Sequence, residues 1–184
     1  MVAVLAGRRV DAADASTTRF PLENVEIVIE KLHRFFTDNK IDYLVCSGAC
    51  GADLIALGVA GELNIPRKMV LPFDAETFRS SSVTDRPGNW GELFDAVNDE
   101  LRKESNVVLF NYAEDDDAVY EKTNFDILNT ADITFENLSA TSDRKKAAVI
   151  IWEGAPKDSG DTTDHFRKEA ITRGYTIEEI NCLK

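Results

Sequence analysis

The sequence predicts an α/β fold, a Rossmann-like three-layer sandwich with a mostly parallel sheet of about six strands. Short apolar runs alternate with helical patterns along the chain, the order expected when a crossover helix follows each parallel strand. Right-handed crossovers place such helices on both faces of the sheet. The chain has 184 residues, 43% of them hydrophobic, which is enough for one domain over residues 1–184 with a buried core.

Short apolar runs predict the strands. They cover Val2–Ala6, Tyr43–Cys46, Lys68–Leu71, Val107–Phe110, Ala147–Trp152 and Tyr175–Ile180. The first run stops at Gly7 and the third at Pro72, which restricts the backbone before it. Ligands of such sheets bind at the carboxyl ends of the strands, so the loops after the first, second, third and fifth strands are expected to converge.

The segments between the strands carry apolar residues at spacings of three and four, which predicts helices. The helices cover Leu22–Thr37, the segment after the second strand up to Leu63, Trp90–Leu101, the segment from the acidic run 115–117 to Leu138, and Asp164–Arg173. Pro21 suits a first helical turn, and the acidic run is expected to complement a helix N-terminus in preference to binding a metal. Asp74–Asn89 is expected to be a polar loop, and Ser139–Lys146 a mobile surface link.

The turn Ser47–Asp53 joins the second strand to its helix through small residues. Gly48 and Gly51 permit a tight turn, and the first N–H groups of the helix are expected to be free for an anion. The turn is therefore a candidate phosphate or carboxylate cradle, with tight packing alone as the alternative. Asp53 either caps the helix or accepts a hydrogen bond from a ribose hydroxyl.

The charge balance separates two classes of partner. The chain carries 21 Lys and Arg against 33 Asp and Glu, a net charge of −12, so we expect no nucleic-acid partner. A small anionic ligand needs only local donors, and arginines cluster next to predicted loops at Arg8, Arg9, Arg19 and Arg79. Arg8 either points into the crevice or forms surface salt bridges, and Arg79 is either a ligand clamp or a tie for its loop.

We expect a cytoplasmic protein with no membrane partner, because the chain has no apolar run of about 18 residues and no secretory leader pattern. Cys46, Cys50 and Cys182 have neither disulfide-framework nor zinc spacing, in agreement with a reducing compartment. A thiolate at Cys50 would be stabilised by the adjacent helix N-terminus, although a small loop residue is the favoured interpretation. The sequence shows no metal constellation, and we expect no required cofactor.

Several polar or aromatic side chains are placed near the carboxyl ends of the strands. Asn124 shares an inward-facing helical stripe with Tyr120, so it either bonds neighbouring loop backbone or contacts a ligand edge. Trp152, at the end of the fifth strand, either stacks on a base or packs in the core or rim. His165, beside Asp164, is a candidate general base.

Several dispersed pieces of the chain match one family in the right order. They are Ala6-Gly7-Arg8, Arg19-Phe20-Pro21, the turn Ser47–Asp53, Leu71-Pro72-Phe73 and Ser159-Gly160-Asp161-Thr162-Thr163-Asp164. Together they resemble the SLOG superfamily, Rossmann-like proteins that bind nucleotides or nucleotide derivatives. This superfamily includes the Lonely Guy phosphoribohydrolases and the DNA-processing protein of natural transformation. The match runs from about Val2 to Gly174 and is closest to SLOG modules associated with signalling domains.

The resemblance implies a nucleotide or NAD-derived ligand in a crevice at the carboxyl ends of the strands. The implied ligand-binding residues are Gly7, Arg8, Ser47, Gly48, Gly51, Ala52, Asp53, Phe73, Arg79, Tyr120, Asn124, Trp152, Gly160, Thr162 and Thr163. The Lonely Guy signature Pro-Gly-Gly-x-Gly-Thr-x-x-Glu is not matched, since Asp161 stands where a glycine is expected and the glutamate is missing. Asp164 and Asp53 are the candidate catalytic carboxylates.

Three functions are consistent with these residues. The leading hypothesis is a domain that binds, and thereby senses, a nucleotide or NAD-derived ligand without transforming it. The first alternative is a nucleotide N-glycosidic hydrolase in which Asp164 or Asp53 stabilises an oxocarbenium-like centre or activates water. The second is a non-catalytic interaction module. In each case the apolar helix faces predict a homodimer.

Overall fold

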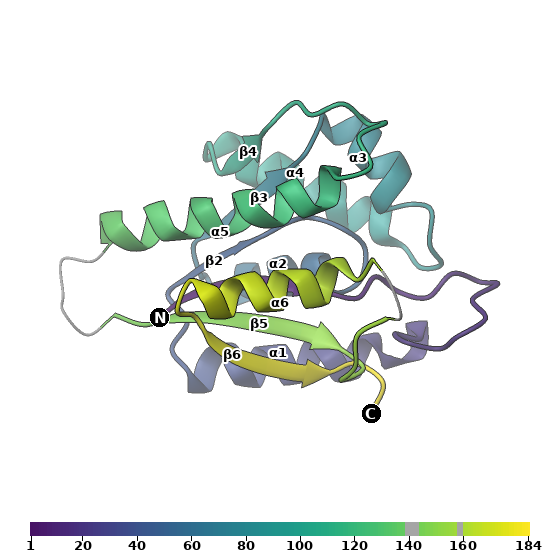
Figure 1. Ribbon diagram of the computed structural model, residues 1–184, viewed down its shortest axis with the longest axis horizontal. Helices are drawn as coiled ribbons and strands as arrows, with labels where there is room; N and C mark the ends of the chain where they lie inside the picture. Colours follow the sequence, from purple (N-terminus) through teal and green to yellow (C-terminus); the bar gives the residue numbers. More distant parts are fainter. Residues whose placement is uncertain (139–143, 158–159) are drawn as a thin grey trace.

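The computed structural model describes residues 1–138, 144–157 and 160–184, and within them a six-stranded sheet lies between two layers of helices (Figure 1). The strands are β1 (Val2–Gly7), β2 (Tyr43–Cys46), β3 (Arg67–Leu71), β4 (Val107–Leu109), β5 (Lys146–Trp152) and β6 (Thr176–Asn181). Their order is β4-β3-β2-β1-β5-β6, and every neighbouring pair is parallel. This arrangement confirms the predicted α/β class and the Rossmann-like three-layer sandwich.

The helices divide between the two faces of the sheet. They are α1 (Val25–Asp38), preceded by the short 3₁₀ helix η1 (Leu22–Asn24), α2 (Ala52–Glu62), α3 (Ala75–Ser82), α4 (Trp90–Lys103), α5 (Val119–Leu138) and α6 (Thr162–Thr172). Figure 1 shows α5 and α6 in front of the sheet and α1 and α2 behind it. Alternate residues of β1 enter the two cores: Ala3 and Leu5 pack with the α1–α4 side, and Val4 and Ala6 with the α5–α6 side.

The strand order reverses beside β1. From β1 the chain steps outward through β2 and β3 to β4, and α5 then returns across β3, β2 and β1 before β5 pairs with the other side of β1. Gly7 at the end of β1 therefore lies next to Ile151 near the end of β5. In open α/β sheets such a switch point is where the loops on either side leave a crevice for ligands.

Two glycines bring α2 close to the end of β1. A Cβ atom on Gly7 would lie 2.4 Å from the Cβ of Ala52 and 2.7 Å from the carbonyl oxygen of Ile151. Gly51 adopts a positive φ of 89°, and a Cβ there would lie 2.8 Å from the Arg8 carbonyl oxygen. Both positions thus exclude a side chain, and Gly51 also needs the left-handed backbone that glycine adopts without strain.

The expected polar loop Asp74–Asn89 was wrong in part, because its first half is helix α3. Asp74 caps this helix: its carboxylate accepts hydrogen bonds from the backbone N–H groups of Glu76 and Thr77, both at 3.0 Å. Phe78 is buried against Phe73 and Phe94, so this single apolar side chain anchors an otherwise polar helix. The helix was missed because one large buried apolar residue gives no periodic apolar pattern.

The acidic run behaves as expected at the start of α5. Asp116 accepts a hydrogen bond from the backbone N–H of Ala118 at 2.9 Å and pairs with Lys122. Residues 139–143 of the expected surface link lie outside the described residues, and Lys146 belongs to β5. Among the helices described, none combines the length and the apolar character needed to cross a membrane.

Candidate functional site

A cavity of about 220 Å³, the central cavity, opens at the switch point. Gly7 at the end of β1, Ser47 and Asp53 around the start of α2, and Tyr120 and Asn124 of α5 all line it. Helix α3 and the first turn of α6 complete the wall with Phe78, Ser82, Thr162 and Thr163. Segments that follow β1, β2, β3 and β5 therefore converge as predicted, and α5 joins them.

A second hollow of about 320 Å³, the basic hollow, adjoins the central cavity. The two share Gly7, Arg9, Thr162 and Thr163. Among the described residues that line the basic hollow, five are cationic and one is acidic: they are Arg8, Arg9, Arg19, Arg86, Lys157 and Asp11. The lining is therefore mostly cationic, in contrast to the net charge of the chain, and Asp85, Glu153 and Asp161 pair with its four arginines.

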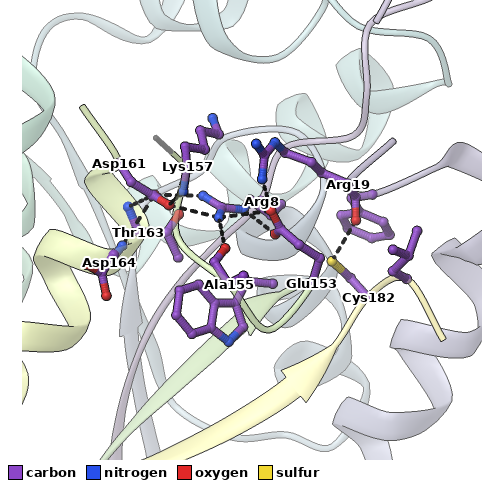
Figure 2. Close-up of polar contacts among 12 residues, drawn as sticks. Arg8, Arg19, Glu153, Ala155, Lys157, Asp161, Thr163, Asp164 and Cys182 are labelled. Atoms are coloured by element: carbon purple, nitrogen blue, oxygen red, sulfur yellow. Dashed lines mark hydrogen bonds and ion pairs between the residues drawn. The ribbon is translucent and has the colours of Figure 1, made fainter. Parts of the chain in front are cut away.

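Arg8 lies at the centre of a buried ion-pair cluster (Figure 2). Its side chain is 3% exposed; Nε donates to Glu153 at 2.6 Å, Nη1 to Asp161 at 2.6 Å, and Nη2 to the carbonyl of Ala155 at 3.0 Å. Arg19 pairs with the same Glu153. The guanidinium of Arg8 is thus engaged by the chain itself and fastens the β5–α6 segment to the end of β1.

Asp161 occupies the N-terminus of α6. Its carboxylate accepts hydrogen bonds from the backbone N–H groups of Thr163 at 3.0 Å, Asp164 at 3.3 Å and Lys157 at 2.8 Å. Burial opposes ionisation of Asp161, but the hydrogen bonds from Arg8 and Lys157 and the charge of Arg8 lower its pKa to about 2. The turn that resembles a phosphate-binding loop therefore already holds a carboxylate of this chain.

The turn Ser47–Asp53 differs from the expected anion cradle, because several of its N–H groups are used internally. The N–H of Ala49 donates to the Asp53 carboxylate at 3.3 Å, that of Cys50 to the Ser82 carbonyl at 3.0 Å, and that of Ala52 to the Arg8 carbonyl at 3.1 Å. These bonds tie the turn to α3 and to the end of β1. The ends of β1 and β2 are consequently held in fixed positions around the central cavity.

Asp53 lines the central cavity although it is only 9% exposed. Burial raises the pKa of its carboxyl to about 7, and the N–H of Ala49 and the charge of Arg9 offset part of that rise. Its carboxylate bonds the turn before α2, while Gly51 is the residue at the helix N-cap. Asp53 is therefore both a structural acceptor and a polar group at the cavity wall.

Tyr120 and Asn124 connect α5 to the opposite walls of the central cavity. The Tyr120 hydroxyl lies 3.1 Å from the hydroxyl of Ser82, and Asn124 Nδ2 donates to the Thr162 carbonyl at 2.8 Å. Asn124 thus bonds neighbouring backbone, one of its two predicted roles, while lining the cavity where a ligand edge would lie.

Some of the predicted site residues lie outside both hollows. Gly48 faces Met69 and Phe94, so a side chain there would clash with the core. Ala52 and Phe73 are buried, the former against Gly7 and the latter against Phe78.

Arg79 and Trp152 also serve packing or pairing elsewhere. Arg79 donates to Asp95 of α4 at 2.8 and 2.9 Å, so it ties α3 to α4 instead of reaching the crevice. Trp152 is buried and donates to Glu179 at 3.0 Å. The guanidinium of Arg8 lies 5.8 Å from the ring centre of Trp152, so the ring supports the ion-pair cluster. Gly160 has a φ of 61°, and a Cβ atom there would contact no atom of the described residues within 4 Å.

The other candidate catalytic groups do not line either hollow. Asp164 pairs with Lys168 at 2.7 Å and with Arg167 at 3.0 Å, and these contacts lower its pKa. The ring of His165 packs edge-on against Phe125. Burial raises the pKa of the Cys50 thiol despite the charge of Arg9, which agrees with the favoured interpretation of Cys50 as a small loop residue.

Sequence analysis missed the acidic partners of Arg8 and two cations of the basic hollow. Arg86 and Lys157 come from segments far apart in sequence, and only the fold places them together. Asp161 carried a usable signal, since an aspartate directly before a helix is a common N-cap. No group of three or more His, Cys, Asp or Glu that could hold a metal ion occurs among the described residues.

Comparison with known protein-family models and with functionally described proteins found no match to this sequence. The functional interpretation therefore depends on the geometry of the central cavity and the basic hollow.

Proposed function

We propose that the protein binds a nucleotide or NAD-derived small ligand at the carboxyl edge of the sheet, as a SLOG-type sensor would. The anionic group of the ligand enters the basic hollow, and its sugar or base enters the central cavity. The observation that carries this proposal is the gathering of cationic side chains next to a partly apolar cavity at the switch point, in a chain of net charge −12.

The cations of the basic hollow differ in how far the chain neutralises them. Arg9 pairs with Asp85, and Arg86 lies 3.9 Å from the same carboxylate. Lys157 forms no ion pair with any carboxylate that the structure describes. Lys157 is exposed, and partial desolvation together with the positive charges of Arg8 and Arg19 lowers its pKa. An anion placed beside Lys157 therefore relieves repulsion and gains charge-assisted hydrogen bonds.

The central cavity combines apolar and hydrogen-bonding walls. Leu5, Phe78 and Ile127 supply apolar surface, and Ser47 and Asn124 supply polar groups. Such a mixture suits a sugar or a base, because the apolar side chains exclude water and the few polar groups fix orientation. The shared wall at Gly7, Arg9, Thr162 and Thr163 allows one ligand to span both hollows.

The same geometry reduces the number of candidate catalytic residues for the hydrolase alternative. Asp164 lies outside both hollows and is paired with Lys168 and Arg167, so of the two predicted catalytic carboxylates only Asp53 lines the central cavity. Binding without turnover is favoured because no second carboxylate stands beside Asp53 among the described residues that line this cavity.

The first test identifies the ligand. The purified protein is incubated with a mixture of nucleoside monophosphates, NAD and ADP-ribose, and bound and free fractions are analysed by chromatography with mass detection. An unchanged ligand enriched in the bound fraction supports the proposal. Release of free base together with a ribose phosphate or ADP-ribose would instead assign a hydrolase. If neither result is seen, an interaction module remains as the function.

The second test uses a matched pair of lysine variants. Lys157→Gln removes a cation of the basic hollow and is expected to weaken binding of the identified ligand about tenfold, the loss of one charge-assisted hydrogen bond. Lys168→Gln removes an exposed cation on α6 that pairs with Asp164, and it is expected to leave affinity unchanged. Equal affinities for the two variants in titration calorimetry would place the anion elsewhere.

A further inference from the structure

Asp53 is a buried carboxyl with unused acceptor capacity at the central cavity. It is 9% exposed, and among the described residues only the N–H of Ala49 donates to it, at 3.3 Å. A carboxyl group offers two oxygens with about four acceptor sites, so most of that capacity is unsatisfied within the chain. The central cavity, which Asp53 lines, gives a ligand access to this unused acceptor capacity.

The titratable groups around Asp53 do not neutralise it. Arg9, on the segment after β1, lies near enough for its charge to act on Asp53, but its guanidinium pairs with Asp85. Cys46 of β2 is a buried thiol whose sulfur lies 4.0 Å from the Asp53 carbonyl oxygen. Tyr120 of α5 bonds Ser82 of α3. The α6 wall contributes Thr162 and Thr163, which carry no charge.

The protonation state of Asp53 is therefore set mainly by burial. Its pKa is raised to about 7, so the acid and the carboxylate are both populated near neutral pH. A hydrogen-bond donor brought into the cavity binds more strongly to the carboxylate form of Asp53 than to its neutral acid form, so it favours the carboxylate. Asn124 adds to this preference, because its amide nitrogen is committed to Thr162 and its amide oxygen is left as an acceptor.

Building on the proposed ligand site, we propose that Asp53 selects a ligand that presents a hydroxyl or amino donor in the central cavity, and that Asp53 releases a proton when this ligand binds. The O–H bond of the carboxyl group breaks, the proton passes to solvent, and the ligand donor takes its place as the partner of the carboxylate. A sugar with free hydroxyl groups has this chemistry. Binding is then coupled to pH at a single residue.

The coupling has a defined direction and size. Below the pKa of the free protein, binding requires that Asp53 lose its proton, so affinity falls as pH falls. With that pKa near 7 and a much lower value in the complex, affinity rises about tenfold from pH 6 to pH 8. Proton release approaches one per ligand at pH 6 and vanishes above about pH 8.

ADP-ribose is the probe for the test, because its pyrophosphate does not titrate over this pH range. Binding is measured by titration calorimetry at pH 6 and pH 8, each in two buffers of different ionisation enthalpy, so that proton release is counted on the unmodified protein. Asp53→Asn is expected to abolish both the pH dependence and the proton release. Asp126→Asn is the matched control, since Asp126 is also buried with a raised pKa but lies outside the cavity and bonds Tyr112.

Each outcome decides the proposal. Proton release and a tenfold pH effect that persist in Asp126→Asn and disappear in Asp53→Asn support it. ADP-ribose binding with equal affinity at both pH values and no proton release overturns it and leaves the proposed ligand site intact. No binding of ADP-ribose at either pH also overturns it, and the ligand mixture then judges the proposed function separately. A carboxyl ¹³C titration of the free protein that places the Asp53 midpoint below about pH 5 would contradict it without any ligand.

Discussion

The carboxylates around the end of β1 fall into two kinds at the scale of single residues. Glu153 and Asp161 are partly buried and face Arg8, and its hydrogen bonds lower the pKa of both despite the loss of solvent. Asp53 is buried with one weak donor, and its pKa is raised. The pKa shifts are opposite because only Glu153 and Asp161 have a hydrogen-bonded cation as partner, whereas burial dominates at Asp53.

Asp53→Asn is expected to stabilise the protein at pH 8. The pKa of Asp53 is about 7 in the folded state against about 4 in the unfolded state, so the folded state binds more protons between these values. Its contribution to stability is therefore greatest below pH 4 and is lost as pH rises to 7. An asparagine does not ionise, so the variant avoids this fall in the free energy of unfolding, which linkage puts at up to about 4 kcal/mol.

The measurement for this residue is urea unfolding of both proteins from pH 5 to pH 8. The stability gain of Asp53→Asn is expected to grow as pH rises and to level off above 7. Asp99→Asn, at an exposed position on α4, serves as the control and is expected to show no such trend. A gain for Asp53→Asn that does not change with pH would contradict the assigned protonation.

At the scale of elements, the cluster of Arg8 fastens the β5–α6 segment to the end of β1. Arg8→Gln leaves Glu153 and Asp161 buried without their main cation, and breaking a buried pair in this way costs about 3–5 kcal/mol. Arg79→Gln removes an exposed pair with Asp95, and we expect a much smaller loss of stability. Denaturant unfolding that gives similar losses for the two variants would mean that the cluster does not hold the segment.

The close approach of α2 to β1 depends on Gly51. Comparison with Gly160 separates the effect of steric contact from that of the positive φ. Gly51→Ala forces a Cβ atom to within 2.8 Å of the Arg8 carbonyl oxygen at a φ of 89°, and we expect a loss of about 2–4 kcal/mol. Gly160→Ala also introduces a Cβ atom at a positive φ, of 61°, but it meets no described atom within 4 Å, so a loss of about 1 kcal/mol is expected. Thermal unfolding compares them, and equal losses would exclude the steric contact as the cause.

The elements themselves were largely predictable from the sequence, and the exception has a physical reason. Strands such as Tyr43–Cys46 are buried on both faces and appear as continuous apolar runs bounded by turn residues. Helix α3 has two buried residues, Phe78 and Ser82, and polar neighbours, so its pattern resembled a loop. Its cap at Asp74 was the signal that could have located it.

At the scale of the whole molecule, contacts between distant segments are the reason that the candidate site was predicted only in part. Gly7, Asp53, Tyr120 and Asn124 were predicted as site residues and do gather at the central cavity, because strand ends and helix faces are encoded locally. The pairing of Arg79 with Asp95 and the arrival of Lys157 at the basic hollow depend on contacts between distant segments. Local patterns carry no information about such contacts.

Charge is likewise organised at the scale of the molecule. The chain carries 33 acidic against 21 basic side chains, yet five of the basic ones line one hollow at the switch point. The negative net charge opposes the approach of large polyanions at long range. If the ligand binds as proposed, the cations of the basic hollow would hold its anionic group, and selectivity for a small ligand would follow from this difference in scale.

The location of ligand binding is the central claim, and amide chemical-shift mapping tests it most directly. ADP-ribose or the ligand identified from the mixture is titrated into ¹⁵N-labelled protein, and shifts are followed residue by residue. We predict that the largest shifts fall on Gly7, Arg9, Thr162 and Thr163, the wall shared by the two hollows, with smaller shifts along α1. Shifts confined to another surface, or no shifts with any ligand of the mixture, would contradict the account.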